Sequence, residues 1–288
     1  SVAAAENILP HVLGGPCVPL LYQAPTVDDM VAHTGLVVSF GGIAMKNTQV
    51  QANGLGAHTA ERQLQELRCA SIEFVNVSPV RDDMSDSLNA EWWPCRPSTD
   101  VAIMLGIAHT LVTEGLVDGK FVERYCVGFD HIVAYLRGEP DGQVKNAEWA
   151  SALAEIPAEK IRTLARRMAG TRTVIGVSWS LQRAEHGEQP YWMATVLGAM
   201  LGYTGLPGGG VTYGYGSVHN IGFGGRRLPQ FKAGVLPQVS NSVASHIPVA
   251  RITDMLLRPG QEFDFNGRRL TYPKIDLVYW AGGNPFHH

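Results

Sequence analysis

The sequence has little charge and no paired cysteine motif. Charged residues make up 17% of its 288 residues, against about 25% in an ordinary soluble domain. The four cysteines are scattered without a CxxC pair, which argues against a zinc ribbon, an iron–sulfur cluster bound within this chain and a disulfide scaffold. The formal net charge is −3 without a long run of like charge, so no nucleic-acid surface is expected. The apolar stretch of about 18 residues that a transmembrane helix needs is also missing.

The common catalytic and nucleotide-binding motifs are absent as well. No GxGxxG segment follows the first predicted strand, and the sequence contains no Walker GxxxxGK segment, no HExxH and no GxSxG. A conventional nicotinamide or ATP-dependent enzyme is therefore disfavoured.

Glycine, in contrast, is abundant, with 32 residues among 288. Glycine lets the backbone adopt left-handed conformations and come close to a ligand or to another segment. Together with the low charge, this abundance indicates that more protein, a large ligand or both cover much of the surface.

Strand and helix patterns alternate through most of the chain. Short apolar runs closed by turn residues predict strands at 36–40, 72–77 and 173–178. Helical patterns cover residues 58–68, 100–114, 121–136, 147–153, 158–169 and 188–201. This alternation predicts an α/β fold with a mostly parallel sheet. We assign residues 1–214 to a dinucleotide-binding-like α/β domain.

The pattern changes after Gly214. An aperiodic stretch rich in glycine, serine and proline precedes a helical pattern at 249–257, and Asn266-Gly267 predicts a hairpin. A last apolar run at 275–280 predicts a buried strand that leads into a glycine loop. We assign residues 215–288 to part of a neighbouring α/β domain and expect the chain to be a fragment of a larger protein.

Four turns of small and polar residues follow predicted strands. They are FGGIAMKN at 40–47, VSPVRDD at 77–83, SWSLQRAEHGEQ at 178–189 and AGGNPFHH at 281–288. Ligands of doubly wound sheets bind outside the carboxyl ends of the strands, and backbone amides freed by glycine suit phosphate oxygens. The series of turns therefore predicts a large polar ligand spread over several loops.

Each residue of these turns also has an ordinary structural interpretation. A lone lysine such as Lys46 is more often solvated, and Trp179 could be a core aromatic. Asn47, Asp83 and Asn284 could form Asx-turns, which is the commoner role of such residues. The argument for a ligand depends on the ordered series and not on any single residue.

Several motifs stand in a fixed order and at specific spacings. They are MKN at 45–47, NVSPVR at 76–81, RPSTDVAIMLGIAHTL at 96–111, WSLQRAEHGEQ at 179–189, LPGGG at 206–210 and GGNPFHH at 282–288. This series resembles the dimethyl sulfoxide reductase family of molybdopterin oxidoreductases, in particular the group of trimethylamine N-oxide and biotin sulfoxide reductases.

The resemblance implies a cofactor and a reaction. Members of this family hold one molybdenum with two molybdopterin guanine dinucleotides and reduce S-oxides or N-oxides by oxygen-atom transfer, with electrons from an external donor such as a cytochrome. The resemblance covers the middle of such an enzyme and places residues 215–288 in a neighbouring cofactor-binding domain. We therefore expect the chain alone to be inactive and to hold no cofactor. Which oxide is reduced, and whether the enzyme is periplasmic or cytoplasmic, stay open.

The resemblance also assigns site residues. Cofactor contacts fall on Lys46, Asn47, Val77, Ser78, Ser98, Thr99, Asp100, Trp179, Ser180, Arg183, Asn284 and His288. A carboxylate such as Asp100 can accept two hydrogen bonds from the N1–H and N2–H₂ edge of guanine, which adenine does not offer.

The molybdenum ligand of the family falls on Ser1. A serine alkoxide is a hard anionic oxygen donor that suits high-valent molybdenum. No catalytic acid or base is assigned. The terminal residues have alternative origins, since Ser1 could remain from tag cleavage and His287 and His288 could begin a purification tag.

Two other classes of function stay open at this point. One is a non-catalytic nucleotide- or metabolite-binding α/β module, which would need a fingerprint loop after the first strand that FGGIAMKN does not supply. The other is an inert paralogue that keeps the fold for interaction, against which the retained WSLQR, HGEQ and GGNPFHH segments argue.

Overall fold

The computed structural model describes residues 3–15, 24–48, 58–216, 240, 243 and 246–280. The chain divides into two units, Ser1–Arg226 and Arg227–His288. The domain boundary expected after residue 214 stays a prediction.

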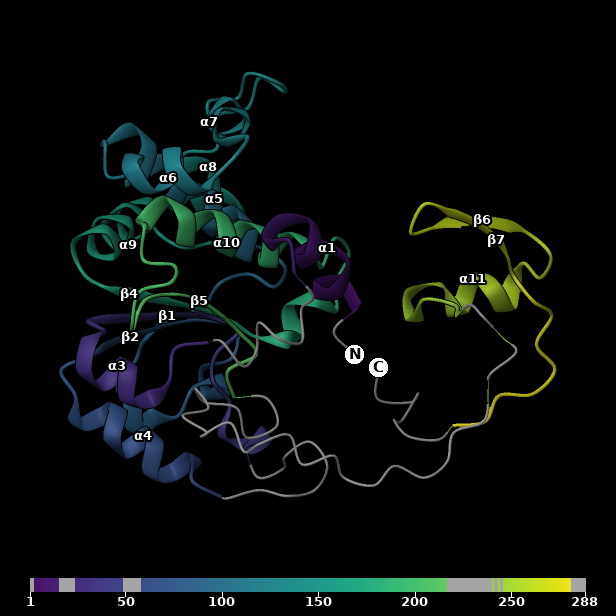
Figure 1. The fold of residues 1–288 in the computed structure, drawn as a ribbon, viewed down its shortest axis with the longest axis horizontal. Coiled ribbons are helices and arrows are strands. Elements are labelled where there is room, and N and C mark those ends of the chain that lie inside the picture. The colour runs from purple at the N-terminus through teal and green to yellow at the C-terminus, as the bar shows by residue number, and fades with distance from the viewer. Residues whose placement is uncertain are drawn as a thin grey trace. The chain divides into compact units, whose positions relative to one another are not determined.

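The first unit is built on a five-stranded sheet with the strand order β3-β2-β1-β4-β5 (Figure 1). The strands are β1 (Leu36–Phe40), β2 (Glu73–Val77), β3 (Glu91–Trp93), β4 (Thr173–Val177) and β5 (Gly210–Tyr213). β1 is central and pairs in parallel with β2 on one side and with β4 on the other. β3 and β5 pair in parallel with β2 and β4. The predicted α/β fold with a parallel sheet on three of these strands is confirmed.

The central strands are apolar because both faces of the sheet are covered. Every residue of β1 and of β4 is buried, and such strands show continuous apolar runs instead of alternation. Val38 pairs with Val75 of β2 and with Ile175 of β4, so β-branched side chains pack side by side across the sheet.

Helices lie on both faces of the sheet (Figure 1). The first unit contains α1 (Ala3–Leu13), α3 (Val27–His33), α4 (Ala60–Cys69), α5 (Asp100–Thr113), α6 (Gly119–Tyr125), α7 (Phe129–Leu136), α8 (Ala147–Ala154), α9 (Ala158–Gly170) and α10 (Gln189–Leu201). One apolar cluster joins α1, α5, α8, α9 and α10 to the sheet, and a second joins α3 and α4 to the opposite face.

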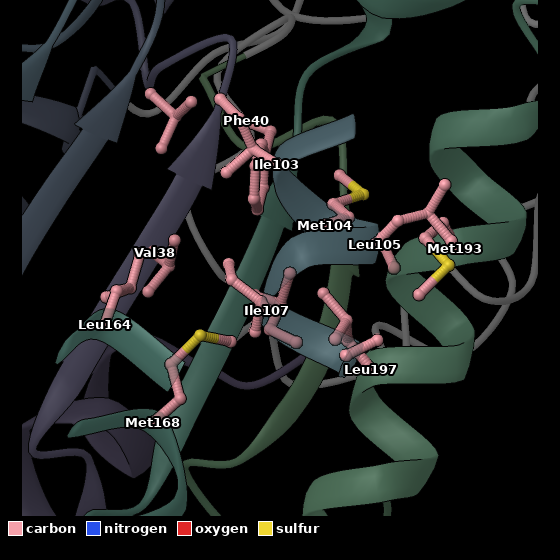
Figure 2. Close-up of a cluster of buried hydrophobic side chains, with 14 of the residues drawn as sticks. Val38, Phe40, Ile103, Met104, Leu105, Ile107, Leu164, Met168, Met193 and Leu197 are labelled. Carbon is pink, nitrogen blue, oxygen red and sulfur yellow. The ribbon is translucent and has the colours of Figure 1, made fainter. Parts of the chain in front are cut away.

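Helix α5 lies in the middle of the larger cluster. Figure 2 shows Ile103 close to Phe40 of β1, and Ile107 between the sheet and Leu197 of α10. Ile103, Ile107 and Leu197 have no exposed surface. A helix that is apolar all round is a buried helix, so α5 holds its first residue, Asp100, in a fixed place next to the sheet.

One predicted helix is wrong. The single helix expected over 121–136 is two helices, α6 and α7. Cys126 is extended, and Gly128 adopts the left-handed conformation with φ of 75°. A left-handed residue cannot continue a right-handed helix, so the chain turns between the two.

The second unit contains η6 (Val249–Arg251), α11 (Ile252–Leu257), β6 (Glu262–Phe265) and β7 (Arg268–Thr271). The predicted hairpin is confirmed, since β6 and β7 pair antiparallel around Asn266 and Gly267, both with positive φ. The buried strand predicted at 275–280 is wrong in this structure. Tyr279 is 85% exposed, and no described strand pairs with the segment. The segment is therefore not a strand here, because a strand is stable only against a neighbouring strand.

No helix in the described ranges has the length and apolar character needed to cross a bilayer.

Candidate functional site

The turns that follow β1, β2 and β4 lie at one edge of the sheet, because the strands are all parallel. Backbone hydrogen bonds join them: Gly41 N donates to Val77 O and Ser178 N donates to Phe40 O, both at 2.9 Å. The strand order reverses at β1, since the chain continues to β2 on one side and β4 lies on the other. Ligands of open α/β sheets bind at such a reversal, so this edge is the candidate site.

The turn after β2 is held by a buried serine. Ser78 is fully buried, and its Oγ donates to Asp83 Oδ2 at 2.7 Å while it accepts from Val80 N at 3.2 Å. Lys46, in the turn after β1, lies 3.7 Å from the other oxygen of Asp83 and is 73% exposed. Asp83 therefore contacts both the turn after β2 and the turn after β1, and the Lys46 ammonium stays exposed to solvent.

The backbone of Ser78 is also engaged. Its N–H donates to Trp93 O at 3.2 Å, and its carbonyl oxygen accepts from Trp92 Nε1 at 2.8 Å. The carbonyl of Val77 accepts from Gly41. These partners show what holds the turn, and the nucleotide contacts expected at Val77 and Ser78 stay predictions.

The residues Ser98, Thr99 and Asp100 form the entry to α5. Ser98 is exposed and left-handed, with φ of 64°. Thr99 is the N-cap, but its hydroxyl donates to Arg96 O at 2.6 Å and caps no helix amide. Asp100 is 9% exposed, and no lysine or arginine of the described part of the chain forms an ion pair with it. The entry to α5 therefore presents an almost buried carboxylate without a cation.

Burial changes the acidity of this region. Desolvation raises the pKa of Asp100 to about 6, against a smaller opposing effect of its own backbone amide. Desolvation, followed by the negative charge of Asp100, raises the pKa of the Cys95 thiol to about 12. Cys95 therefore stays protonated at neutral pH, and the carboxylate of Asp100 needs hydrogen-bond donors to balance its loss of water.

The turn after β4 begins with η5 (Trp179–Gln182). Trp179 stacks on Tyr191 of α10, with ring centroids 5.5 Å apart and 21° between the ring planes. Tyr191 Oη donates to Ser178 O at 2.8 Å, and Ser180 Oγ lies 3.1 Å from Ser178 Oγ. Arg183 ends this turn and is exposed, which leaves its guanidinium open to an anionic group.

Two buried polar residues at this edge were missed by the sequence reasoning. Ser39 and Asn76 are partners in the register of β1 and β2, each 1% exposed. The side-chain amide of Asn76 donates to Arg81 O at 3.2 Å, but Asn76 Oδ1 and Ser39 Oγ have no hydrogen-bond partner in the described structure. The sequence did contain a signal for both residues. Each is the only polar residue within a buried apolar run, one position before the end of the strand.

Some predicted site residues lie outside the described residues. These are Ser1, Asn284 and His288, together with the side chain of Asn47. Their expected roles stay predictions.

Known proteins resemble this chain over its whole length. The family model of the molybdopterin oxidoreductases matches residues 22–288. Biotin sulfoxide reductase of Cereibacter sphaeroides is 47% identical over 100% of this chain and 38% of its own length. Dimethyl sulfoxide/trimethylamine N-oxide reductase of the same organism is 41% identical, and trimethylamine-N-oxide reductase of Haemophilus influenzae is 37% identical, each over 100% of this chain and 36% of its own length.

The resemblance seen in the motifs is therefore confirmed, and this family implies a molybdenum–pterin cofactor. The chain spans little more than a third of the length of these relatives. It belongs to the molybdopterin oxidoreductase family.

Proposed function

We propose that this chain is the central part of a molybdenum-dependent S-oxide or N-oxide reductase, in which its sheet edge binds a guanine dinucleotide form of the pterin cofactor. The observation that carries the proposal is Asp100, a nearly buried carboxylate that forms no ion pair within the described part of the chain and begins the helix that follows β3. The relatives named above supply the reaction class, since they are reductases of S-oxides and N-oxides.

The residues at this edge fit such a cofactor. Guanine and pterin rings both offer N–H donors, and the edge holds acceptors that need donors, in Asp100 and in Asn76 Oδ1. Phosphates need cations, and the exposed side chains of Lys46 and Arg183 lie on two of the turns. Both halves of a dinucleotide thus find complementary groups.

In this proposal the residues at the sheet edge bind the cofactor or position it. Asp100 accepts two hydrogen bonds from the guanine edge, which selects guanine over adenine. Lys46 and Arg183 balance phosphate charge. Trp179, held against Tyr191, supplies an apolar wall that excludes water near the cofactor.

The remaining contacts follow from the resemblance. We propose backbone or hydroxyl contacts at Asn47, Val77, Ser78, Ser98, Thr99 and Ser180, contacts to the second dinucleotide at Asn284 and His288, and a metal ligand at Ser1. When bound, the molybdenum–pterin group supplies the two-electron redox chemistry and oxygen-atom transfer. An external electron donor completes the cycle, and the chain by itself is expected to be inactive.

The test uses the full-length enzyme with Asp100→Asn. The amide loses one acceptor oxygen and presents an N–H₂ to the guanine donors, so the bound guanine nucleotide and the molybdenum per protein should fall. The expected loss of binding free energy is on the order of 1–3 kcal/mol. Guanine released by acid and molybdenum from elemental analysis are the two measurements.

The matched control is Asp130→Asn. Asp130 also lies in the first turn of a helix, α7, but is exposed, so guanine and molybdenum content should stay at parental values. If Asp100→Asn likewise left both unchanged, Asp100 would not contact the nucleotide and the proposal would lose its main support.

A further inference from the structure

Lys46 already has a negatively charged partner at the candidate site. Its Nζ lies 3.7 Å from Oδ1 of Asp83, and no other carboxylate in the described ranges forms an ion pair with it. The side chain of Lys46 is 73% exposed, whereas that of Asp83 is only 24% exposed. The lysine thus has room to move, and the place where its charge is balanced depends on how firmly Asp83 is held.

Asp83 is held by its neighbours on two sides. Its Oδ2 accepts from the hydroxyl of Ser78, which is fully buried, at 2.7 Å. A Cβ on Gly42 would overlap the backbone oxygen of Asp83, so the turn after β1 packs directly against this residue. The residues that follow these two, Ile43 and Met84, form a parallel bridge. The carboxylate therefore keeps its place, and its second oxygen is left for the lysine.

The ion pair is not needed to hold the two turns together. An ion pair with an exposed lysine adds little to stability, and the N–H of Gly41 already joins the turn after β1 to the end of β2 at Val77. The main effect of the pair is electrostatic. A phosphate that binds to the Lys46 ammonium also comes close to the fixed negative charge of Asp83, and this repulsion offsets much of the attraction.

The cation in the turn after β2 is balanced in a similar way. Nε of Arg81 lies 3.7 Å from Oδ1 of Asp86. Asp82, between Arg81 and Asp83, is exposed and forms no ion pair within the described part of the chain. The two ion pairs leave little net positive charge to which a simple anion could bind.

We propose that Asp83 is a specificity-determining residue, which cancels the charge of Lys46 so that a simple phosphate anion does not bind at this edge. Discrimination between ligands comes from repulsive groups as well as from attractive contacts. A whole dinucleotide would overcome the repulsion, since it would also contact groups elsewhere at the edge, such as Arg183 and Asp100. The identity of that ligand rests on the proposed function, whereas the balance of charge between Lys46 and Asp83 does not.

The test is the binding of inorganic pyrophosphate to the full-length enzyme without its cofactor, measured by isothermal titration calorimetry at low salt. Asp83→Asn removes the negative charge but keeps an oxygen that can accept from Ser78. The Kd for pyrophosphate should fall about three- to tenfold in this variant, because one repulsive charge next to Lys46 is lost. The gain should shrink at high salt, because salt screens exposed charges.

Two further variants separate this effect from a general change in charge. Asp82→Asn removes the same charge one position away, and it should lower the Kd by less than about twofold, since water and salt screen an exposed charge. In a Lys46→Gln background, Asp83→Asn should likewise change the Kd by less than about twofold, because the cation that Asp83 balances is gone. Circular dichroism shows whether each variant is folded, and Asp83→Ser replaces Asp83→Asn if the amide disturbs the turn.

Three results would overturn the proposal. They are an unchanged Kd in Asp83→Asn, an equal gain in Asp82→Asn, and a gain of full size in the absence of Lys46. Failure of the proposed function would look different. The parental enzyme, produced with a supply of the cofactor, would then contain no molybdenum, whatever the result of the pyrophosphate titration.

Discussion

Gly214 lies directly against the indole nitrogen of Trp179. A Cβ built on Gly214 would overlap Nε1 of the indole, and Gly214 also has a φ of 76°. The two residues follow the neighbouring strands β5 and β4, and the N–H of Gly214 donates to Val177 O at 2.8 Å. The position of Trp179 at the candidate site thus depends on the absence of a side chain at Gly214, directly after the neighbouring strand β5.

Gly214→Ala should therefore destabilise the chain and displace the indole. The left-handed conformation and the overlap together should cost about 2–4 kcal/mol of unfolding free energy. Urea unfolding measures the loss, and the tryptophan emission of the folded protein reports the displacement. Gly115→Ala is the control, since Gly115 also has a positive φ but nothing near its Cβ position, and it should cost only about 1 kcal/mol. Equal costs for the two variants would contradict the close contact.

Asp100 should make the ligand-free chain less stable as the pH rises. Its folded pKa is raised to about 6 from 3.8, so the folded state holds the proton more tightly than the unfolded state. This contribution is fully present below pH 3.8 and is lost as the pH rises through about 6. Asp100→Asn should thus raise the unfolding free energy at pH 8 by on the order of 1–3 kcal/mol and change it little at pH 4.

Urea unfolding at several pH values checks this expectation. The exposed Asp130→Asn exchange serves as the control, with the same small effect at each pH. If Asp100→Asn shifted stability equally at pH 4 and pH 8, the carboxylate would not be desolvated in the folded state.

Ser39 and Thr173 are both buried hydroxyl residues of the central strands, but they differ in their partners. Ser39 Oγ has none in the described structure, whereas Thr173 Oγ1 donates to the carbonyl oxygens of Met168 at 3.1 Å and Thr171 at 2.9 Å. A buried hydroxyl without a partner costs free energy, and one with a partner stabilises.

Ser39→Ala should therefore leave the ligand-free chain equally stable or stabilise it by up to about 1–2 kcal/mol, while Thr173→Val should destabilise it by about 1–2 kcal/mol. Thermal unfolding of both variants decides the sign. A clear loss of stability in Ser39→Ala would mean that the hydroxyl has a partner, such as a buried water.

Lys145 is a buried lysine between α7 and α8. It is 3% exposed, its Nζ donates to both carboxylate oxygens of Asp141 at 2.8 and 2.7 Å, and it lies 4.3 Å from the centroid of the Tyr135 ring. Lys145→Met should destabilise the chain by about 2–4 kcal/mol, because the ion pair and the ring contact are lost together. Denaturant unfolding measures the effect, with the exposed Lys120→Met as the control. If both variants lost equally little stability, the ion pair and the ring contact of Lys145 would not stabilise the chain.

Much of the candidate site could be predicted because its residues follow strands with a clear pattern. The runs at 36–40, 72–77 and 173–178 are apolar since both faces of the sheet are covered, and the turn of small and polar residues that follows each run marks the candidate site. Two short strands were missed. β3 is EWW and β5 is GVTY, and runs this short become strands only because β2 and β4 offer them a partner.

The fold class, the order of the central elements, the turns of the candidate site and the family could all be predicted from the sequence. These follow from local patterns and from motifs whose residues are adjacent in the chain. Which polar groups already have hydrogen-bond partners became clear only from the three-dimensional structure. It showed that Ser78 is saturated by Asp83, Trp92 and Trp93. It also showed that Asn76 has a buried acceptor without a partner among the described residues and that Gln182 reaches Ala4. Hydrogen-bond partners and burial depend on segments far apart in sequence, and no local pattern records which distant group comes to lie within 3.5 Å.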